Sequence, residues 1–542
     1  MGEWLAHVMQ ITLLAIDLSL WHSRRLHTAN PKENVRGHVM PDQTFQIIAM
    51  VIYMSAMLGI GWYAFRKTSD LDDYMLAGRG LKPGVAALSA GASDMSGWLL
   101  LGLPGAIYVS GLIEVWIAIG LTIGAWLNWK FVAPRLRSYT EVSNNSITVP
   151  SFLENRLKDK SRILRIVSGI IILVFFTFYV SSGMVAGGLF FESSFNSNYT
   201  VGMIVVATIT IAYTLFGGFM GATFTDVAQG LLMLIALILV PIIGLVQVGG
   251  FDGLTTSIRE VDPTFLNIVA GGSVVAIISA ASWGLGYFGQ PHIIVRFMAM
   301  RTPQDAVAGR RIGVGWMVLT VIGAISTALV GIAYFQQNPN LSLTDPEAVF
   351  LDLSQAFFHP FVAGIILAAV LAAVMSTISS QLVVCSSALV EDLYNMVSKR
   401  TLTNKQGVVL GRLGVLVVAI VAIVLASGRS ESILSLVAFA WAGFGAAFGP
   451  TVLLALYWKK LTMPGALAGM VSGAVVVFTW GNSALSDTMY EIVPGFFLNL
   501  IVAVVVSKLT WKANAEIEAE FDLAVKGTRS LKQAAAEKVS AS

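Results

Sequence analysis

The sequence predicts an all-α, polytopic membrane protein with about thirteen transmembrane helices, and three observations carry this prediction. Hydrophobic residues make up 56% of the 542 residues and charged residues only 12%, whereas charged residues make up about 25% of a typical soluble domain. Thirteen apolar stretches are each long enough to cross about 30 Å of hydrocarbon. Small and polar residues interrupt two of these stretches, around Asp94 and before Pro291.

Residues 1–40 form an N-terminal extension that differs from the rest of the chain. Its apolar run, Trp4–Trp21, contains polar residues such as Asp17, so it would be marginal as a spanning helix. No basic segment precedes the run and no small-residue cleavage site follows it, which does not fit a signal peptide. We expect this extension to be dispensable and to lie upstream of a true start at Met40, which N-terminal sequencing of the native protein would test.

Residues 41–511 are predicted to form one transmembrane domain. The expected spans are residues 44–66, 85–110, 112–134, 163–190, 199–217, 224–249, 270–295, 312–335, 361–388, 408–427, 432–458, 464–481 and 491–511. The mean hydropathy of +0.75 agrees with so many spans.

Basic residues indicate how the spans are oriented. They gather in alternate loops, as Arg66, Lys67, Arg79, Lys82, Lys130, Arg135, Arg137, Arg156, Lys158, Lys160, Arg162, Arg296, Arg301, Arg310, Arg311, Lys399, Arg400, Lys405, Lys459 and Lys460. The intervening loops contain almost no Lys or Arg, so the basic side is expected to be cytoplasmic. An odd number of spans then places the C-terminus inside. We expect residues 512–542 to be a cytoplasmic tail with a short helix and no specific interaction.

The first interrupted span is centred on Asp94, which lies among Gly91, Ser93, Ser96 and Gly97. A carboxylate at membrane depth costs roughly 2.5–3.5 kcal/mol on insertion scales and usually faces a functional cavity. The small residues suggest a broken helix, which hydrocarbon tolerates only where protein or a water-filled site receives the freed backbone groups. A carboxylate beside opened carbonyls resembles a cation site, although an aspartate that only caps a turn is the simpler alternative.

The second interrupted span is residues 282–292, which contain three glycines and a proline. Each interrupted span opens a set of five helices, at about 85–249 and about 270–458, and the second set starts from the opposite side of the membrane. Two Gly- or Pro-interrupted spans in corresponding positions are typical of transporters built from inverted repeats with a midplane site.

Aromatic residues near the breaks are candidates for a substrate pocket. Trp283 and Tyr287 would share one face of a helix with Pro291, and Tyr179 is a weaker candidate for a third wall. Ordinary packing also explains aromatic residues at this spacing. The glycines between them favour the pocket, since they let a ligand approach the backbone.

Two further polar positions are candidates for ion handling. Ser376 and Thr377 lie in an apolar span, and their hydroxyl oxygens would suit a hard cation such as sodium, unless they only bond their own helix. Asp226 lies at an expected helix start, where a carboxylate stabilises the helix; a place on the ion exit path is the alternative.

Several classes of function lack their sequence signatures. The net charge of +3 is too small to indicate nucleic-acid binding. The only cysteine, Cys385, lies in an apolar span and is expected to be a buried thiol. The phosphate-loop, HExxH and serine-hydrolase patterns are missing, which argues against an enzyme. His292 and His359 are expected to be interfacial or loop residues.

From about Gln46 to Thr510 the sequence resembles the sodium/solute symporter family and, within it, the bacterial sodium/proline symporters. The resemblance is strongest in residues 90–98 (AGASDMSGW), 283–292 (WGLGYFGQPH), 372–377 (AAVMST) and 443–450 (GFGAAFGP). It implies a core of two inverted five-helix repeats, a LeuT-like fold, with the first helix of each repeat broken. It also implies sodium-coupled uptake of L-proline across a bacterial inner membrane, without any cofactor other than sodium as the coupling ion.

The resemblance also implies roles for individual residues. Sodium would be bound by the carbonyls of Ala92, Met95 and Ala373 and the hydroxyls of Ser376 and Thr377. Asp94 would be needed for sodium coupling, and Asp226 would take part in sodium release. The residues expected to bind proline are Ser96, Gly97, Tyr179, Trp283, Tyr287 and Pro291.

Three alternatives remain open at this stage. The first is a symporter for another small solute, or one coupled to protons. The second is a solute-sensing membrane receptor, which usually carries a signalling domain that the short tail does not provide. The third is a channel, which fits an occluding aromatic wall less well. Beyond proline, sodium and the lipid bilayer, the sequence indicates no nucleic-acid partner and no obligate protein partner.

Overall fold

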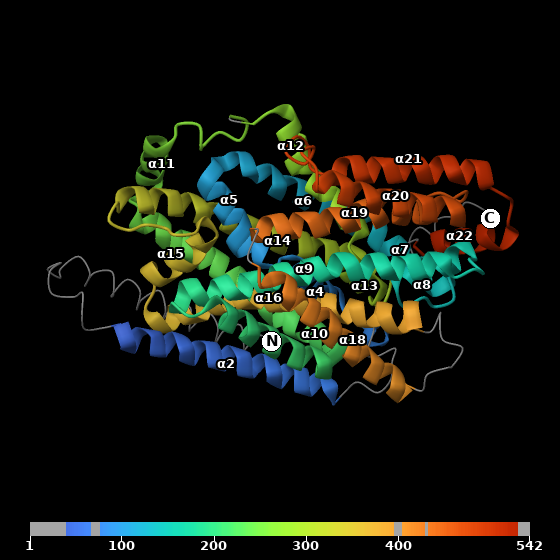
Figure 1. Cartoon of the computed structure of the whole chain (residues 1–542), viewed down its shortest axis with the longest axis horizontal. Coiled ribbons are helices and arrows are strands. Elements are labelled where there is room, and N and C mark those ends of the chain that lie inside the picture. Colours follow the sequence, from blue (N-terminus) through green and yellow to red (C-terminus); the bar gives the residue numbers. More distant parts are fainter. Residues whose placement is uncertain (1–38, 67–75, 271, 395–403, 429–431, 529–542) are drawn as a thin grey trace, which may run out of the picture.

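A computed structural model describes residues 39–66, 76–270, 272–394, 404–428 and 432–528. These residues are almost entirely helical and contain no β-strand, only one isolated bridge between Leu81 and Met300. The long helices lie side by side along the horizontal axis of Figure 1. The prediction of an all-α polytopic membrane protein is confirmed, whereas residues 1–38 of the N-terminal extension lie outside the described residues.

The helices divide into long spans, shorter segments and brief π- or 3₁₀-helical turns. The long helices are α2 (Val39–Phe65), α9 (Ile163–Phe195), α10 (Tyr199–Gln247), α14 (Asp305–Gln337), α16 (Pro360–Ser387), α18 (Asn404–Ala426), α19 (Ile433–Tyr457), α20 (Met463–Gly481) and α21 (Ile492–Thr510). The shorter α-helices are α4 (Pro83–Asp94), α5 (Leu103–Ser110), α6 (Val115–Leu127), α7 (Ala133–Val142), α8 (Val149–Leu157), α11 (Gly250–Val261), α12 (Val274–Ala281), α13 (Pro291–Met298), α15 (Val349–Phe357) and α22 (Ala515–Gly527). The π- and 3₁₀-helical turns are η1 (Ala77–Arg79), η2 (Trp98–Gly102), η3 (Gly111–Glu114), η4 (Asn128–Val132), η5 (Ser282–Gly289), η6 (Pro346–Ala348) and η7 (Ala388–Tyr394).

The expected spans coincide with helical segments within the described residues. Ten helices there are long and apolar enough to cross a membrane, and two shorter apolar helices cover Tyr199–Leu215 and Val274–Gly289. The 45-residue run Trp98–Val142 covers the second half of the expected span 85–110 and all of 112–134. The two are separated at Gly111, which ends α5 with φ 75° and ψ −161°. The positive φ favours glycine at this turn.

The expected boundary between spans 199–217 and 224–249 is not a loop. Gly218 has the non-helical angles φ 56° and ψ −152°, and α10 consists of two helical segments that meet at this kink, Tyr199–Leu215 and Gly217–Gln247, which match the two expected spans. Asp226 lies two turns beyond the kink. The prediction that it starts a helix is therefore wrong, because the second helical segment begins at the kink and Asp226 lies inside it.

Helix α16 lies at the centre of the bundle. In the most apolar stretch of this span, 89% of the residues are buried, compared with 33% in the corresponding stretches of several outer spans. Its neighbours include α2, α4, α9 and α10. A helix that is enclosed on all sides can hold polar groups away from lipid, and α16 carries Ser376, Thr377, Ser379 and Ser380, all of which are buried.

The two ends of the bundle differ in charge. Helices α11 and α15 lie at the left end in Figure 1, and α7, α8 and α22 lie at the right end. The right end carries basic residues predicted to be cytoplasmic, such as Arg135, Arg156 and Lys459. Some residues of the predicted basic loops, among them Lys67, Lys399 and Arg400, lie outside the described residues.

The tail interacts with this basic end, so the prediction of a tail without specific interactions is wrong. Phe521 of α22 is buried, and Arg135 and Arg156 lie over its ring at 5.6 and 5.5 Å from the ring centre. Lys158 forms ion pairs with Glu516 and Glu520 at 2.9 and 2.5 Å. Burial lowers the pKa of Lys158, but these two carboxylates raise it more, and the net shift is upward. The sequence shows the helix but not the surface that receives it.

Candidate functional site

The first predicted break lies where the sequence places it. Helix α4 ends at Asp94, Met95 adopts φ −78° and ψ 72°, and the chain resumes as the π-helix η2. The Asp94 carbonyl accepts hydrogen bonds from the Ser96 amide at 2.9 Å and the Trp98 indole at 3.2 Å. Gly97 lies close to α9, since a Cβ atom there would be 2.9 Å from the Cβ of Ala186. The freed backbone groups at this break are thus enclosed by protein, as a membrane interior requires.

The second break also lies where the sequence places it. Helix α12 changes into the 3₁₀-helix η5 at Ser282, and Gln290 is extended, with φ −77° and ψ 106°. Pro291 then begins α13 as its first residue. A 3₁₀-helix has three residues per turn, so the spacing of four that suggested one shared helical face does not apply to this segment.

The two breaks meet in the middle of the bundle. The Tyr287 hydroxyl, from η5, donates a hydrogen bond to Oδ2 of Asp94, at the end of α4. Both residues are buried, and they are 193 positions apart in the sequence. The other carboxylate oxygen of Asp94, Oδ1, has no hydrogen-bond partner among the described residues.

Oxygen atoms of α16 gather beside the first break. The Ser376 hydroxyl donates to the Ala92 carbonyl at 2.7 Å and lies 3.0 Å from the Ala373 carbonyl. The Thr377 hydroxyl lies 3.1 Å from the Ala373 carbonyl. Met95, whose carbonyl is the remaining predicted sodium ligand, is fully buried at the break itself. Hard cations take such carbonyl and hydroxyl oxygens as ligands.

The predicted aromatic residues lie in one cluster of rings. Trp283 stacks on Tyr490 at 5.4 Å and lies 6.4 Å from Trp98. Tyr287 meets Trp441 edge to face at 5.2 Å. Trp441 and Tyr490 were not predicted from the sequence, in which aromatic residues of apolar spans are too common to single out.

Tyr179 and Pro291 are placed by contacts other than the ring pairs of this cluster. Tyr179 of α9 is buried edge to face with His292 at 5.9 Å, and its hydroxyl has no hydrogen-bond partner among the described residues. His292 is fully buried, so its predicted interfacial position is wrong. Pro291 lines a small cavity of about 20 Å³, together with Phe219 and Asp392.

Asp226 lies in a separate polar group. Its Oδ2 accepts hydrogen bonds from the Ser89 hydroxyl at 2.7 Å and from Arg296 at 3.1 Å. Arg296 also donates to Ser380 at 2.5 Å and to the His292 carbonyl at 2.5 Å. Arg296 is fully buried, so its assignment to a basic loop is wrong. Its place near the end of an apolar span gave no sign that α13 packs inward.

Comparison with known proteins identifies the family. A sequence model described as the sodium:solute symporter family matches residues 74–473. The chain belongs to the sodium:solute symporter family. Membership makes this chain a transporter and implies sodium as the ion that is co-transported.

Relatives of the symporter are similar over most of its length. It is 55% identical over 466 residues to the high-affinity proline transporter PutP of Bacillus subtilis, covering 86% of this chain and 98% of that protein. It is 50% identical over 466 residues to the osmoregulated proline transporter OpuE of the same organism, covering 86% of this chain and 94% of that protein. It is 50% identical over 491 residues to a sodium/proline symporter of Staphylococcus aureus, covering 89% of this chain and 95% of that protein.

Solved structures show the fold of the symporter. A sodium-coupled sialic acid symporter in a substrate-bound outward-open state matches with a TM-score of 0.75 at 21% identity, covering 87% of this chain and 99% of that one. A transporter of the nucleobase-cation-symport-1 family matches with a TM-score of 0.52 at 14% identity, covering 84% of this chain and 99% of that one. The predicted LeuT-like fold, with a broken first helix in each inverted repeat, is confirmed.

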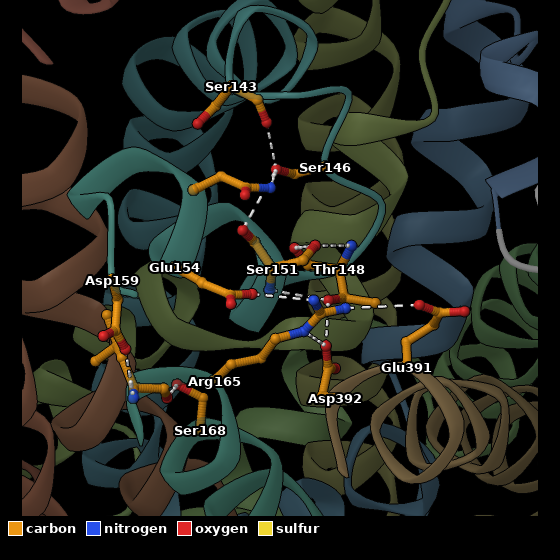
Figure 2. Close-up of polar contacts among 12 residues, drawn as sticks. Ser143, Ser146, Thr148, Ser151, Glu154, Asp159, Arg165, Ser168, Glu391 and Asp392 are labelled. Carbon is orange, nitrogen blue, oxygen red and sulfur yellow. Dashed lines mark hydrogen bonds and ion pairs between the residues drawn. The ribbon is translucent and has the colours of Figure 1, made fainter. Parts of the chain in front are cut away.

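Another polar network of the symporter lies near its basic end and was missed by sequence reasoning. Figure 2 shows Arg165 of α9 among three carboxylates. The guanidinium lies 3.0 Å from Glu154, 3.6 Å from Glu391 and 2.8 Å from Asp392. Thr148 donates to Asp392 at 2.9 Å. The network ties α8 and η7 to α9, next to the cavity that Pro291 lines.

Proposed function

We propose that this symporter couples inward movement of sodium to uptake of L-proline by alternating access. The observation that supports coupling most directly is the hydrogen bond from Tyr287 to Asp94. It joins a residue proposed to bind the substrate to the carboxylate proposed to be needed for sodium. The names of the relatives, which are proline transporters at 50–55% identity, support proline as the substrate.

Sodium is proposed to bind between the first break and α16. The ligands would be the carbonyls of Ala92, Met95 and Ala373 with the hydroxyls of Ser376 and Thr377. The hydroxyls of Ser376 and Thr377 hydrogen-bond the carbonyls of Ala92 and Ala373. These oxygens would turn toward sodium when it binds, and the nearby Asp94 carboxylate would balance its charge.

Proline is proposed to bind between the two broken helices. Its carboxylate would face the amide groups at the start of the second half of the first broken helix, near Ser96 and Gly97, because a helix N-terminus favours anions. Its ring would pack on Trp283 and Tyr287, with Tyr179 opposite. Pro291 would act at the edge of this pocket, where it begins α13 after η5.

Asp226 is proposed to act in sodium release. Ser376, Ser379 and Ser380 follow one another along α16, from the proposed sodium site to the group formed by Arg296 and Asp226. A sodium ion leaving toward the basic end would pass these hydroxyls. Asp226 could attract it only in competition with Arg296, which already neutralises the carboxylate.

The driving forces are large enough for accumulation. One charge moving through 100 mV contributes about 2.3 kcal/mol, and a tenfold sodium gradient contributes about 1.4 kcal/mol. Together these supply about 3.7 kcal/mol, enough to concentrate a substrate several hundred-fold. The proposed location is a bacterial inner membrane, with the basic end and the C-terminus in the cytoplasm, in agreement with the positive-inside rule.

Uptake of radiolabelled L-proline into proteoliposomes tests the proposal. We expect an inward sodium gradient to drive accumulation, and an equal potassium gradient to give only equilibration. An excess of unlabelled proline should abolish the signal, while unrelated amino acids should not. Proline uptake that is the same with either cation would contradict sodium coupling, and no uptake under any gradient would contradict proline as the substrate.

A further inference from the structure

The second break contains a backbone carbonyl that has lost its usual donor. Tyr287 lies in the 3₁₀-helix η5, where its carbonyl would accept a hydrogen bond from the amide of residue 290; in an α-helix the donor would be the amide of residue 291. Gln290 is extended, the conformation that a following proline favours, and residue 291 is proline, which has no amide hydrogen. In a membrane interior such a carbonyl must find another donor, because an unsatisfied polar group there costs several kcal/mol.

Asn128 supplies that donor from another helix. Its Nδ2 donates to the Tyr287 carbonyl at 3.0 Å, and its side chain is fully buried. Asn128 is the first residue of η4, directly after α6. Helix α6 approaches η5 very closely, since a Cβ atom at Gly124 would lie 2.2 Å from the Gly284 carbonyl oxygen. A short side chain can therefore reach across.

The same replacement occurs at a second proline. Pro450 lies inside α19, so the Ala446 carbonyl lacks its helical donor. Asn499 of α21 donates to the carbonyls of Ala446 and Ala447, both at 2.7 Å, and is also fully buried. Both asparagines thus donate to a backbone carbonyl that lacks its helical donor because of a proline.

A third proline shows that an asparagine is not the only solution. Pro241 lies inside α10, which leaves the carbonyl of Leu237 without its helical donor. Gly323 of α14 packs directly on that carbonyl, and a Cβ atom there would be 2.1 Å from its oxygen. Close backbone contact is therefore tolerated at one such carbonyl, and directed amide donors serve the other two.

The residue held by Asn128 is the one that links the two breaks. The ring of Tyr287 packs on Trp441, and its hydroxyl bonds Asp94. Trp441 holds the other side of η5, with its indole nitrogen donating to the Trp283 carbonyl at 2.7 Å. The carbonyls of Trp283 and Tyr287 are thus held by side chains from two different elements, α19 and η4.

We infer that Asn128 is a positioning residue for both proline and sodium. It replaces the amide missing at Pro291, fixes the carbonyl of Tyr287 and thereby sets where the Tyr287 ring and hydroxyl stand relative to Asp94. Asn499 makes the matching replacement in α19 and α21, outside the pocket, and stabilises the fold only. This inference rests on the proposed function, which assigns Tyr287 to the substrate and Asp94 to sodium.

The test compares Asn128→Leu with Asn499→Leu, because both changes remove an amide of similar size from a proline-vacated carbonyl. Asn128→Leu is expected to raise the half-saturating concentrations of proline and of sodium about tenfold, with the maximal uptake rate within about threefold of the unmodified protein. Asn499→Leu is expected to leave both concentrations within about twofold. Thermal unfolding in detergent measures the loss of stability in each variant.

A second background makes the test specific for the missing amide. Pro291→Ala restores an amide at position 291 and removes the proline that favours an extended Gln290, so a backbone donor for the Tyr287 carbonyl becomes available. Asn128→Leu added to Pro291→Ala should therefore change the two concentrations less than about threefold relative to Pro291→Ala alone. If Asn128→Leu does not fold, Asn128→Ala takes its place. Unchanged concentrations in Asn128→Leu, an equal shift in Asn499→Leu, or an equal shift in both backgrounds would each overturn the inference.

A failure of the proposed substrate gives a different result. If the unmodified protein takes up no proline, the proposed function fails, and the variants are then compared by the sodium concentration that half-maximally raises the unfolding temperature. Asn128→Leu should shift that concentration and Asn499→Leu should not. Equal values for both variants would overturn the positioning role independently of proline.

Discussion

Asp94 and Asp226 are both buried carboxylates, but their surroundings differ. Asp226 is paired with Arg296 at 3.1 Å, and both side chains are inaccessible to solvent. Asp94 is bonded only through Oδ2 to a neutral tyrosine hydroxyl, and its Oδ1 has no hydrogen-bond partner in the part of the chain that the structure describes. A buried carboxylate without a cationic partner is the one expected to attract a free cation.

Asp94→Asn is expected to raise the half-saturating sodium concentration for proline uptake at least about tenfold, or a loss of about 1.4 kcal/mol of sodium binding. The amide keeps the shape of the side chain and a hydrogen-bonding partner for Tyr287, so folding should be affected less than sodium dependence. Sodium-titrated uptake in proteoliposomes measures the effect. An unchanged sodium titration would refute the role assigned to Asp94.

Trp283→Ala is expected to raise the half-saturating proline concentration about tenfold with little change for sodium, because its ring packs on three other aromatic rings, whereas Tyr287 is the residue that bonds Asp94. Tyr287→Phe should change both, since it removes the hydroxyl that bonds Asp94. Equal sodium affinity in Tyr287→Phe and the unmodified protein would contradict the link between the breaks.

Asp226→Asn is expected to destabilise the protein by about 3–5 kcal/mol, because it leaves the Arg296 guanidinium buried without a counter-charge. The double variant Asp226→Asn with Arg296→Gln removes both charges and should restore much of the yield of folded protein that Asp226→Asn loses. Size-exclusion chromatography of detergent extracts measures the yield of folded protein. A double variant no better than Asp226→Asn alone would show that the pair is not what the fold requires.

At the scale of helices, the breaks were predictable and the partners of the broken segments were not. Glycine, serine and an aspartate inside an apolar run predict a break in a helix, and these residues can be seen in the sequence. The sequence does not show which other helix packs against the broken segment. Arg296, Trp441 and Asn128 were therefore missed, although an asparagine alone in an apolar span is a signal that could have singled out Asn128.

Helix α10 shows a smaller error of boundary. The sequence predicts two spans here, and the structure has two helical segments, Tyr199–Leu215 and Gly217–Gln247, joined at the kink at Gly218. The second segment begins earlier than expected, so Asp226 lies two turns inside it and is not a capping residue. A run of small residues shows that a helix is interrupted but not at which residue.

The docked tail helix provides a prediction at this scale. Phe521→Ala removes a buried ring that lies under Arg135 and Arg156, at an expected cost of about 1–3 kcal/mol to docking. Limited proteolysis should then cut within α22 several-fold faster than in the unmodified protein. Leu523→Ala is the matched control, because Leu523 is 55% exposed on the same helix. Equal rates for the two variants would show that Phe521 does not hold the tail.

For the whole molecule, the sequence predicts the architecture well because the membrane imposes it. The length of the apolar runs identifies the spans. Five spans separate the start of the first set from the start of the second, so the second set starts from the opposite side of the membrane and is inverted. The LeuT-like fold and the family follow. The boundaries of the repeats at about 85–249 and 270–458, and the status of residues 1–40 and 512–542 as separate segments, stay predictions.

The central claim, that proline and sodium binding are coupled, depends on one contact between the two halves of the chain. Two broken helices from opposite halves meet at Tyr287 and Asp94, which places the proposed proline and sodium sites against each other near the middle of the bundle. Binding at one site then changes the surroundings of the other. Because such coupling of binding free energies is reciprocal, proline must act on sodium as sodium acts on proline.

Influx of labelled sodium into proteoliposomes, driven by an inward gradient of L-proline with no sodium gradient and no membrane potential, tests this claim most directly. We predict a saturable, proline-dependent sodium influx that is lost in Asp94→Asn. Sodium influx that is the same with and without proline would contradict the account.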